Sequence, residues 1–134
     1  MIAIDTNIVV RFLTQDDESQ YRKTLEVFKN PEIFIPDTVI LETEWVLRFA
    51  YRFEPVQVCS ALRNLLGLQN VYIANPMSVH QALVWHESGL DFADAFHLAQ
   101  SQNCETFYTF DEKFIKKAAS LTKCQVQKPD ERSQ

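Results

Sequence analysis

The chain has 134 residues, 46% of them apolar, which is enough for one compact domain with a real core. Its net charge of −5 argues against a general nucleic-acid binder, because phosphate contacts require cations. From the start of the sequence we expect no signal peptide, and its apolar runs are shorter than a membrane span. Three widely spaced cysteines without a Cys-x-x-Cys pair indicate reduced thiols in a cytoplasmic protein rather than a disulfide frame or a zinc site.

Short apolar strands alternate with helices in the predicted chain order. We predict strands over 2–5, 33–36, 71–73, 106–110 and 124–126. We predict helices over 16–30 (capped by Asp16 or Asp17), 37–51 (capped by Asp37), 55–66 (ended by Gly67), 76–88, 92–103 and 112–119. Thr6 and Asn7 can begin a further helix. The alternation predicts an α/β fold whose parallel sheet is covered by helices on both faces. We expect one domain over 1–126 and a polar tail over 127–134.

Four aspartates lie where predicted strands end or predicted helices begin. Asp5 ends the first strand and Asp111 follows the fourth, and ligands of such sheets bind beyond these strand ends. Asp91 is a natural N-cap, and Asp94 follows it by three residues in a mostly apolar helix. His97, one turn after Asp94, is a possible partner for it. Capping explains Asp5, Asp91 and Asp111 about as well as a functional site does.

The predicted helix over 37–51 carries two glutamates with different surroundings. Glu42 shares an apolar stripe with Trp45 and Phe49 and has no cation one turn away. A buried charge without a partner is costly, so Glu42 either finds a distant partner or serves a site. Glu44 has Arg48 at i+4, which gives it an ordinary solvated explanation. We therefore take Glu42, and not Glu44, as the candidate site residue.

These carboxylates change the meaning of the net charge. If five of the 18 acids belong to one site, 13 acids remain against 13 basic residues, and the rest of the surface is neutral. A nucleic-acid substrate is therefore compatible with the composition. Carboxylates without His or Cys ligands favour Mg²⁺ or Mn²⁺ over zinc, and such ions assist the hydrolysis of phosphodiesters.

Four segments of the chain resemble the signature segments of PIN domains, with VapC-type toxins as the closest likeness. They are 1–13 (MIAIDTNIVVRFL), 40–47 (ILETEWVL), 90–99 (LDFADAFHLA) and 108–114 (YTFDEKF). They occur in the order and at the spacing of the family. The remaining chain fits between them, so the resemblance covers nearly the whole chain. The resemblance implies a three-layer α/β/α sandwich with a mostly parallel central sheet of about five strands.

The resemblance also implies roles for individual residues. The four core acids of the family, which bind the metal and act in catalysis, fall on Asp5, Glu42, Asp94 and Asp111. Asp91 matches an additional acid that many members carry. The small polar residues that orient water or carboxylates in the family match Thr6, Asn7 and Thr109.

On this resemblance we expect an endoribonuclease that depends on Mg²⁺ or Mn²⁺ and is the toxin of a toxin–antitoxin pair. A small VapB-type antitoxin is the expected protein partner, and a homodimer or higher oligomer is the expected assembly. The aromatic segment with Trp45, Phe49, Tyr51 and Phe53 offers a groove for the antitoxin, although core packing explains most of it equally well.

Other functions are compatible with an acid after the first strand. Haloacid-dehalogenase-like phosphatases require a second Asp two residues after the first, where this chain has Asn7. Receiver domains require an acceptor Asp after the third strand, and residues 73–76 (IANP) contain none. A PIN nuclease that is not a toxin, or a PIN-like module that binds RNA or protein without cutting, stays open as an alternative.

Overall fold

The structure is a computed structural model that describes residues 1–130. Its contacts divide the chain into two compact units, Met1–Pro76 and Met77–Gln134. Of the predicted polar tail, residues 131–134 lie outside the described part, and Gln127 belongs to the last strand. Among the helices of residues 1–130, none has both the length and the apolar character needed to cross a bilayer.

The first unit is built around a parallel sheet with the strand order β1-β2-β3. In chain order its elements are β1 (Ile2–Ala3), α1 (Thr6–Thr14), α2 (Glu18–Val27), β2 (Ile33–Phe34), α3 (Asp37–Phe49), α4 (Pro55–Leu66) and β3 (Val71–Tyr72). Ile33 of β2 lies opposite Ile2 on one side and Val71 on the other. Ile33 and Ile35 are both fully buried, which places the centre of this sheet in the core.

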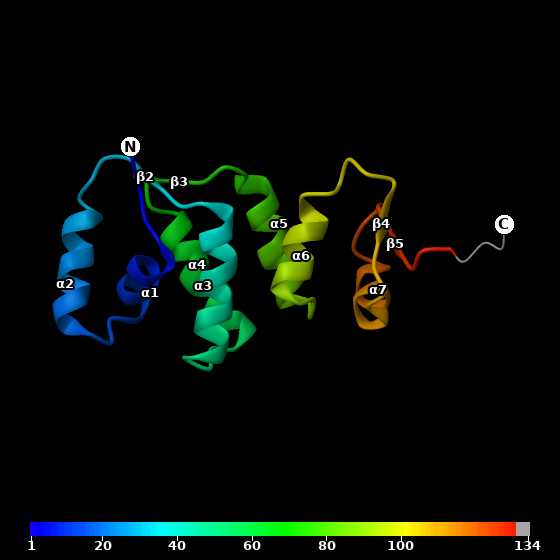
Figure 1. The fold of residues 1–134 in the computed structure, drawn as a ribbon, viewed down its shortest axis with the longest axis horizontal. Coiled ribbons are helices and arrows are strands. Elements are labelled where there is room, and N and C mark those ends of the chain that lie inside the picture. The colour runs from blue at the N-terminus through cyan, green and yellow to red at the C-terminus, as the bar shows by residue number, and fades with distance from the viewer. Residues whose placement is uncertain (131–134) are drawn as a thin grey trace. The chain divides into compact units, whose positions relative to one another are not determined.

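Helices α2, α1 and α3 lie side by side, with α1 in contact with both neighbours (Figure 1). The rings of Phe12 and Phe28 stack at 3.9 Å between centroids and join α1 to the end of α2. Helix α4 packs against α3 and β3. Its bounds agree with the prediction, because Pro55 starts it and Gly67 is its C-cap.

Asp16 and Asp17 have different roles at the start of α2. Asp17 is the N-cap, and its carboxylate accepts the backbone N–H of Gln20 at 3.0 Å. The Asp16 carboxylate instead accepts hydrogen bonds from Arg11 at 3.1 Å and from the Tyr51 hydroxyl at 2.6 Å. The Tyr51 hydrogen bond, followed by that from Thr14, lowers the pKa of Asp16. This clamp ties α1, the start of α2 and the chain after α3 together.

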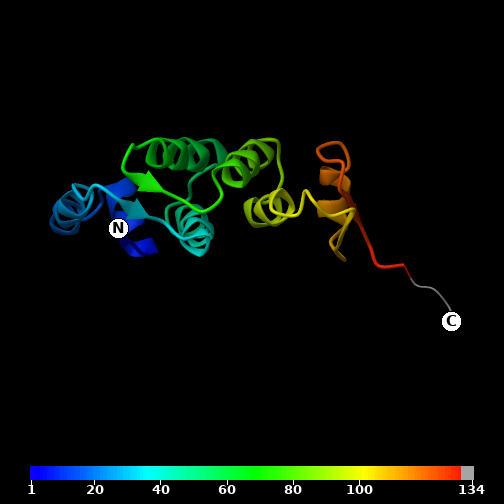
Figure 2. The same ribbon diagram turned by 90° about the horizontal axis from the view of Figure 1, so that it is seen from above.

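The second unit contains α5 (Pro76–Glu87), α6 (Phe92–Ala99), β4 (Thr106–Tyr108), α7 (Glu112–Ala118) and β5 (Gln125–Gln127). Strands β4 and β5 pair in parallel, with Phe107 opposite Val126. Helices α5 and α6 lie side by side in both ribbon views (Figures 1 and 2). Gly89 makes the turn between them at a φ of 110°, a conformation that favours glycine. His86 Nδ1 lies 2.7 Å from the Leu90 carbonyl oxygen and closes this turn.

The α/β class and the parallel pairing of the strands are confirmed. Within residues 1–130 the strands are distributed over a sheet of three strands and a sheet of two, so each sheet is small. The prediction was wrong at some ends: α2 is shorter than 16–30, α6 ends at Ala99, and Pro36 rather than Asp37 is the N-cap of α3. Helix α1, for which only a start was predicted, continues for nine residues.

Candidate active site

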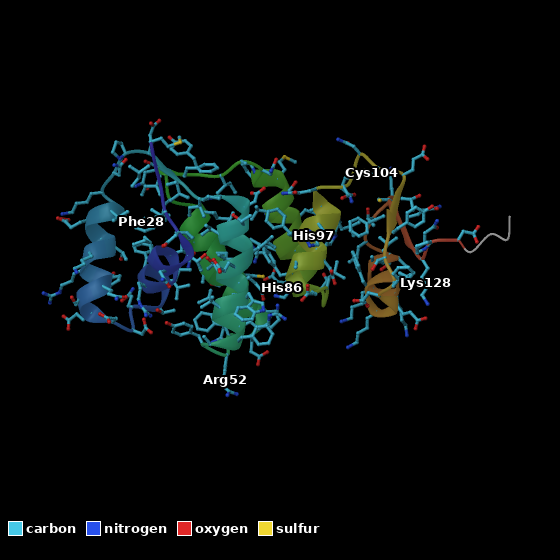
Figure 3. All side chains as sticks on the ribbon, in the orientation of Figure 1. Phe28, Arg52, His86, His97, Cys104 and Lys128 are labelled. Atoms are coloured by element: carbon cyan, nitrogen blue, oxygen red, sulfur yellow. The ribbon has the colours of Figure 1, made fainter. Side chains whose placement is uncertain are left out.

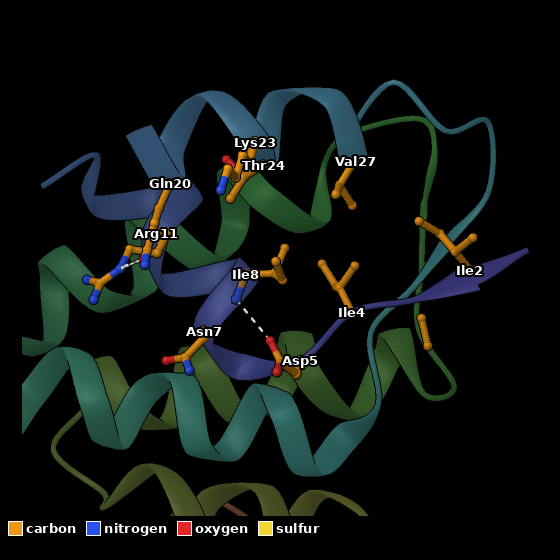
Figure 4. Close-up of a pocket in the computed structure, with 11 residues that line it drawn as sticks. Ile2, Ile4, Asp5, Asn7, Ile8, Arg11, Gln20, Lys23, Thr24 and Val27 are labelled. Atoms are coloured by element: carbon orange, nitrogen blue, oxygen red, sulfur yellow. Dashed lines mark hydrogen bonds between the residues drawn. The ribbon is translucent and has the colours of Figure 1, made fainter. Parts of the chain in front are cut away.

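Asp5 lies directly after β1 and begins α1. Its backbone is extended, and its Oδ1 accepts the backbone N–H of Ile8 at 3.0 Å, so the side chain is an N-cap (Figure 4). The residue is exposed, and no hydrogen bond to its second carboxylate oxygen occurs among the described residues. The capping interpretation of Asp5 is therefore correct, and one oxygen stays available for a ligand.

Thr6 brings Glu42 to the same end of α1. The Thr6 hydroxyl, on a residue that is only 8% exposed, donates a short hydrogen bond to Glu42 Oε1. Glu42 belongs to α3, so this bond joins two helices that are 36 positions apart in sequence. Because Thr6 follows Asp5, the bond holds the Glu42 carboxylate near the capped N-terminus of α1. The structure thus joins Thr6 to Glu42, which the sequence had placed in one predicted site.

The reasoning that separated Glu42 from Glu44 is wrong about burial. The stripe with Glu42 faces outward, since Trp45 is 56% and Phe49 is 58% exposed. Glu44 is 2% exposed, and its Oε2 forms an ion pair with Arg48 Nε at 2.9 Å. Helix α3 carries apolar residues on two faces, and the buried face is the one with Ile40 and Leu47. Arg48 is the predicted partner of Glu44, but the pair lies at the core rather than in solvent.

Asp91 and Asp94 lie at the start of α6 in the second unit. Asp91 is the N-cap, because its Oδ2 accepts the backbone N–H of Asp94 at 3.2 Å. Asp94 is half-buried, and its pKa is raised by burial first and then by the charges of Asp91 and Asp111. His97, further along α6 (Figure 3), opposes this shift. Asp91 and Asp111 are therefore each close enough to Asp94 to repel its charge.

Asp111 follows β4 and is the N-cap of α7. Its Oδ1 accepts the backbone N–H of Phe114 at 3.1 Å. The Thr109 hydroxyl oxygen accepts the backbone N–H of Asp111 at 3.1 Å, which fixes the turn between strand and helix. Thr109 thus contacts Asp111 through the backbone, and its role in orienting water or a carboxylate stays a prediction.

The candidate acids are divided between the two units. Asp5 and Glu42 lie in the first unit with Thr6 and the exposed Asn7, whereas Asp91, Asp94 and Asp111 lie in the second with Thr109. In residues 1–130 no three His, Cys, Asp or Glu side chains are grouped in a way that could hold a metal ion. That these residues form one complete site therefore stays a prediction.

The chemistry of the donors fits a hard divalent cation. All four core candidates are carboxylates, and oxygen ligands of this kind suit Mg²⁺ or Mn²⁺. Burial is the first cause of the raised pKa of Asp94, and the charges of Asp91 and Asp111 add to it; a bound cation would offset that added negative charge.

Comparison with known proteins identifies the family. The model of the PIN domain family matches residues 2–120, which is most of the chain. The chain belongs to the PIN domain family.

Two solved structures align with most of the chain at low sequence identity. One is VapC20 of Mycobacterium tuberculosis, a toxin that cleaves the sarcin–ricin loop, with 21% identity and a TM-score of 0.42 over 93% of this chain and 99% of that one. Another is VapBC2 of Rickettsia felis bound to a DNA fragment from its promoter, with 18% identity and a TM-score of 0.39 over 97% and 100%. No functionally curated protein matches the chain significantly.

The sequence interpretation missed one set of residues beside Asp5. Gln20, Lys23, Thr24 and Val27 line a cavity that Asp5 and Asn7 also line. Their spacing of three and four residues places them on one face of α2, and this pattern was visible in the sequence. The missing signal was the proximity of that face to Asp5, which only the packing of α1 on α2 supplies.

We expect Asp94→Asn to leave the metal-free PIN domain as stable as the parent or more stable at neutral pH. Because burial and neighbouring acids raise the native pKa of Asp94, its ionised form opposes folding. This destabilisation is absent below the unfolded pKa of Asp94. It grows as the pH rises from the unfolded pKa to the raised native pKa, and it is fully present above the native pKa. Thermal melts of parent and mutant in EDTA, at acidic and neutral pH, measure it. A mutant less stable by about 0.5–2 kcal/mol at neutral pH would show that Asp94 serves the start of its helix instead.

We expect Glu44→Gln to destabilise this PIN domain more than Glu42→Gln does. The first change removes a buried charge from the ion pair with Arg48, which is 34% exposed, so we expect a loss of about 1–3 kcal/mol. Gln at position 42 is exposed and keeps an acceptor for Thr6, so its effect should stay within about 0.5 kcal/mol. Urea denaturation of both variants gives the comparison. Equal losses would contradict the assignment of Glu44 to the core.

Proposed function

We propose that this PIN domain is a Mg²⁺- or Mn²⁺-dependent endoribonuclease that hydrolyses RNA phosphodiester bonds, and that it is the toxin of a VapBC-type pair acting in the cytoplasm. The observation that carries the proposal is the match of the PIN domain family to residues 2–120. The acids Asp5, Glu42, Asp94 and Asp111, which the resemblance assigns to the core positions of the family, support it. Membership of the family supports the nuclease activity, and the all-carboxylate donor set supports the choice of metal.

Each acid has a role that its local geometry supports. Asp5 and Asp111 use one oxygen to cap a helix, which fixes the carboxylate and leaves its other oxygen to contact a cation. Thr6 holds Glu42 in one orientation through its hydroxyl. Asp94 supplies charge from a half-buried position.

When bound, a divalent cation polarises a phosphate oxygen and lowers the pKa of water for in-line attack. The protein's contribution is to hold its carboxylates at fixed positions. Asn7 is exposed beside Asp5, where its amide can orient water, and Thr109 fixes the turn that carries Asp111. Asp91 holds the first turn of α6 and adds negative charge beside Asp94.

A module that only binds RNA or protein is the second candidate function. The surroundings of Asp94 argue against it, because a pure binder has little use for carboxylates that repel one another. A PIN nuclease that is not a toxin shares all of the proposed chemistry. The presence of an antitoxin partner separates that alternative from the proposed toxin.

The proposed protein partners are a small VapB-type antitoxin and a second copy of the chain. Trp45 and Phe49 form an exposed aromatic pair on α3, with 5.0 Å between ring centroids. Tyr51 and Phe53, further along the same segment, are half-buried. An exposed aromatic pair of this kind is typical of protein contact surfaces, which supports a partner at this segment.

We expect the purified protein to cleave RNA in Mg²⁺ or Mn²⁺ and to lose this activity in excess EDTA. The reason is that carboxylates alone provide neither a metal-activated water for the attack nor a positive charge to stabilise the phosphate in the transition state. A gel assay on labelled RNA, with the same preparation of an inactive mutant as the control for contaminating nuclease, measures the activity. Undiminished cleavage in EDTA by the parent alone would contradict the metal-dependent mechanism.

We expect Asp5→Asn, Glu42→Gln, Asp94→Asn and Asp111→Asn each to reduce cleavage by order 10² or more, since each removes a charge that the metal requires. Asp17→Asn is the matched control, because Asp17 caps α2 as Asp5 caps α1 but lies outside the candidate set. Asn is itself a good N-cap, so both variants should stay folded. The measurement is kcat/KM for each folded variant. If Asp17→Asn were as damaging as Asp5→Asn, the loss would reflect capping and not catalysis.

A further inference from the structure

A cavity of about 710 Å³ lies in the first unit between β1, α1 and α2. Asp5 and Asn7 lie at one side of it, and Lys23 and Thr24 lie at the opposite side (Figure 4). Its volume falls within the range of small-molecule binding sites and is sufficient for a nucleotide. The cavity therefore adjoins one of the proposed catalytic carboxylates.

The lining combines apolar walls with unpartnered amides. The side chains of Ile4, Ile8 and Val27 supply apolar surface from β1, α1 and α2. Gln20 accepts a hydrogen bond from Arg11 Nε at 2.5 Å through its carbonyl oxygen, and its amide NH₂ has no partner among the described residues. The exposed Asn7 amide likewise has no partner within residues 1–130. Apolar walls suit the faces of a base, and amides suit its hydrogen-bonding edge.

Lys23 differs from the other cationic side chains of residues 1–30. Within residues 1–30, all of which are described, Arg11 pairs with Asp16 at 3.1 Å, Arg22 with Glu18 at 2.7 Å and Lys29 with Glu26 at 2.6 Å. Lys23 has no carboxylate partner there, is exposed and lines the cavity. In a chain with a net charge of −5, this is a cation available to an anionic ligand beside Asp5.

We propose that this cavity binds the nucleotide next to the scissile phosphate of a single-stranded RNA. The base lies between the apolar walls, its edge meets the amides of Asn7 and Gln20, and a backbone phosphate contacts Lys23. The proposal rests on the proposed nuclease function, because that function places the scissile phosphate at Asp5. A single strand is required, since a base stacked in a duplex cannot enter a cavity of this kind.

The test compares Lys23→Gln with Lys29→Gln in the full chain. Both changes remove one positive charge at or just after α2, but only Lys23 lines the cavity. Binding of a short fluorescein-labelled single-stranded RNA of mixed sequence is measured by anisotropy in an Asp94→Asn background, at several salt concentrations. We expect Lys23→Gln to weaken binding about 3- to 10-fold and to reduce the slope of log K against log salt by about 0.7, as loss of one phosphate contact predicts. Lys29→Gln should change the affinity less than about twofold.

A second variant tests the cavity without a change of charge. Val27→Phe places a larger side chain in the apolar wall and so narrows the cavity. It should weaken binding of the single strand and leave the weaker binding of an RNA duplex unchanged. Equal effects of Lys23→Gln and Lys29→Gln, together with a silent Val27→Phe, would overturn the assignment of the cavity.

Failure of this inference and failure of the proposed function give different results. If the parent cleaves RNA and Lys23→Gln alters neither Kd nor KM, the nuclease stands and the cavity assignment is wrong. If RNA binding depends on Lys23 but the parent never cleaves with Mg²⁺ or Mn²⁺, the cavity binds RNA and the nuclease function is wrong. A protein that neither binds nor cleaves RNA would overturn both.

Discussion

The backbone N–H groups at the start of each helix need acceptors, and in this chain carboxylates repeatedly supply them. Asp5, Asp91 and Asp111 each cap a helix with one side-chain oxygen. Asp5 and Asp111 also follow strands, so the same position satisfies a helix and presents a charge at a strand end. The partial positive charge of a helix N-terminus attracts a carboxylate in both roles. Helix capping and the proposed metal binding are therefore compatible at these residues.

How far the sequence predicts the fold depends on how distinct each local signal is. Helix α4 was predicted to its last residue because Pro55 and Gly67 mark its ends. Helix α1 was not, because its compact apolar run around Val9 and Val10 resembles a buried strand as much as a helix. The distribution of the strands over two small sheets depends on pairing between distant residues, which periodicity does not encode.

The candidate site shows the same division between local and distant information. The caps at Asp91 and Asp111 were predictable because capping involves residues three positions apart. The burial of Glu44 was not, since periodicity shows which residues share a face of α3 but not which face meets the core. The bond between Thr6 and Glu42 links residues 36 positions apart, and only the family resemblance had placed them in one site.

The clamp at Asp16 has a consequence for how the chain can change over time. Arg11 contacts Gln20, Asp16 and the Tyr51 hydroxyl at once, and Tyr51 in turn donates to Asp16. A relative that replaces Tyr51 by Phe loses a donor to Asp16 and an acceptor for Arg11 in one step. We therefore expect positions 11, 16 and 51 to covary across homologues, and drift at position 51 to alter Gln20 at the cavity wall through Arg11, which bonds to both residues.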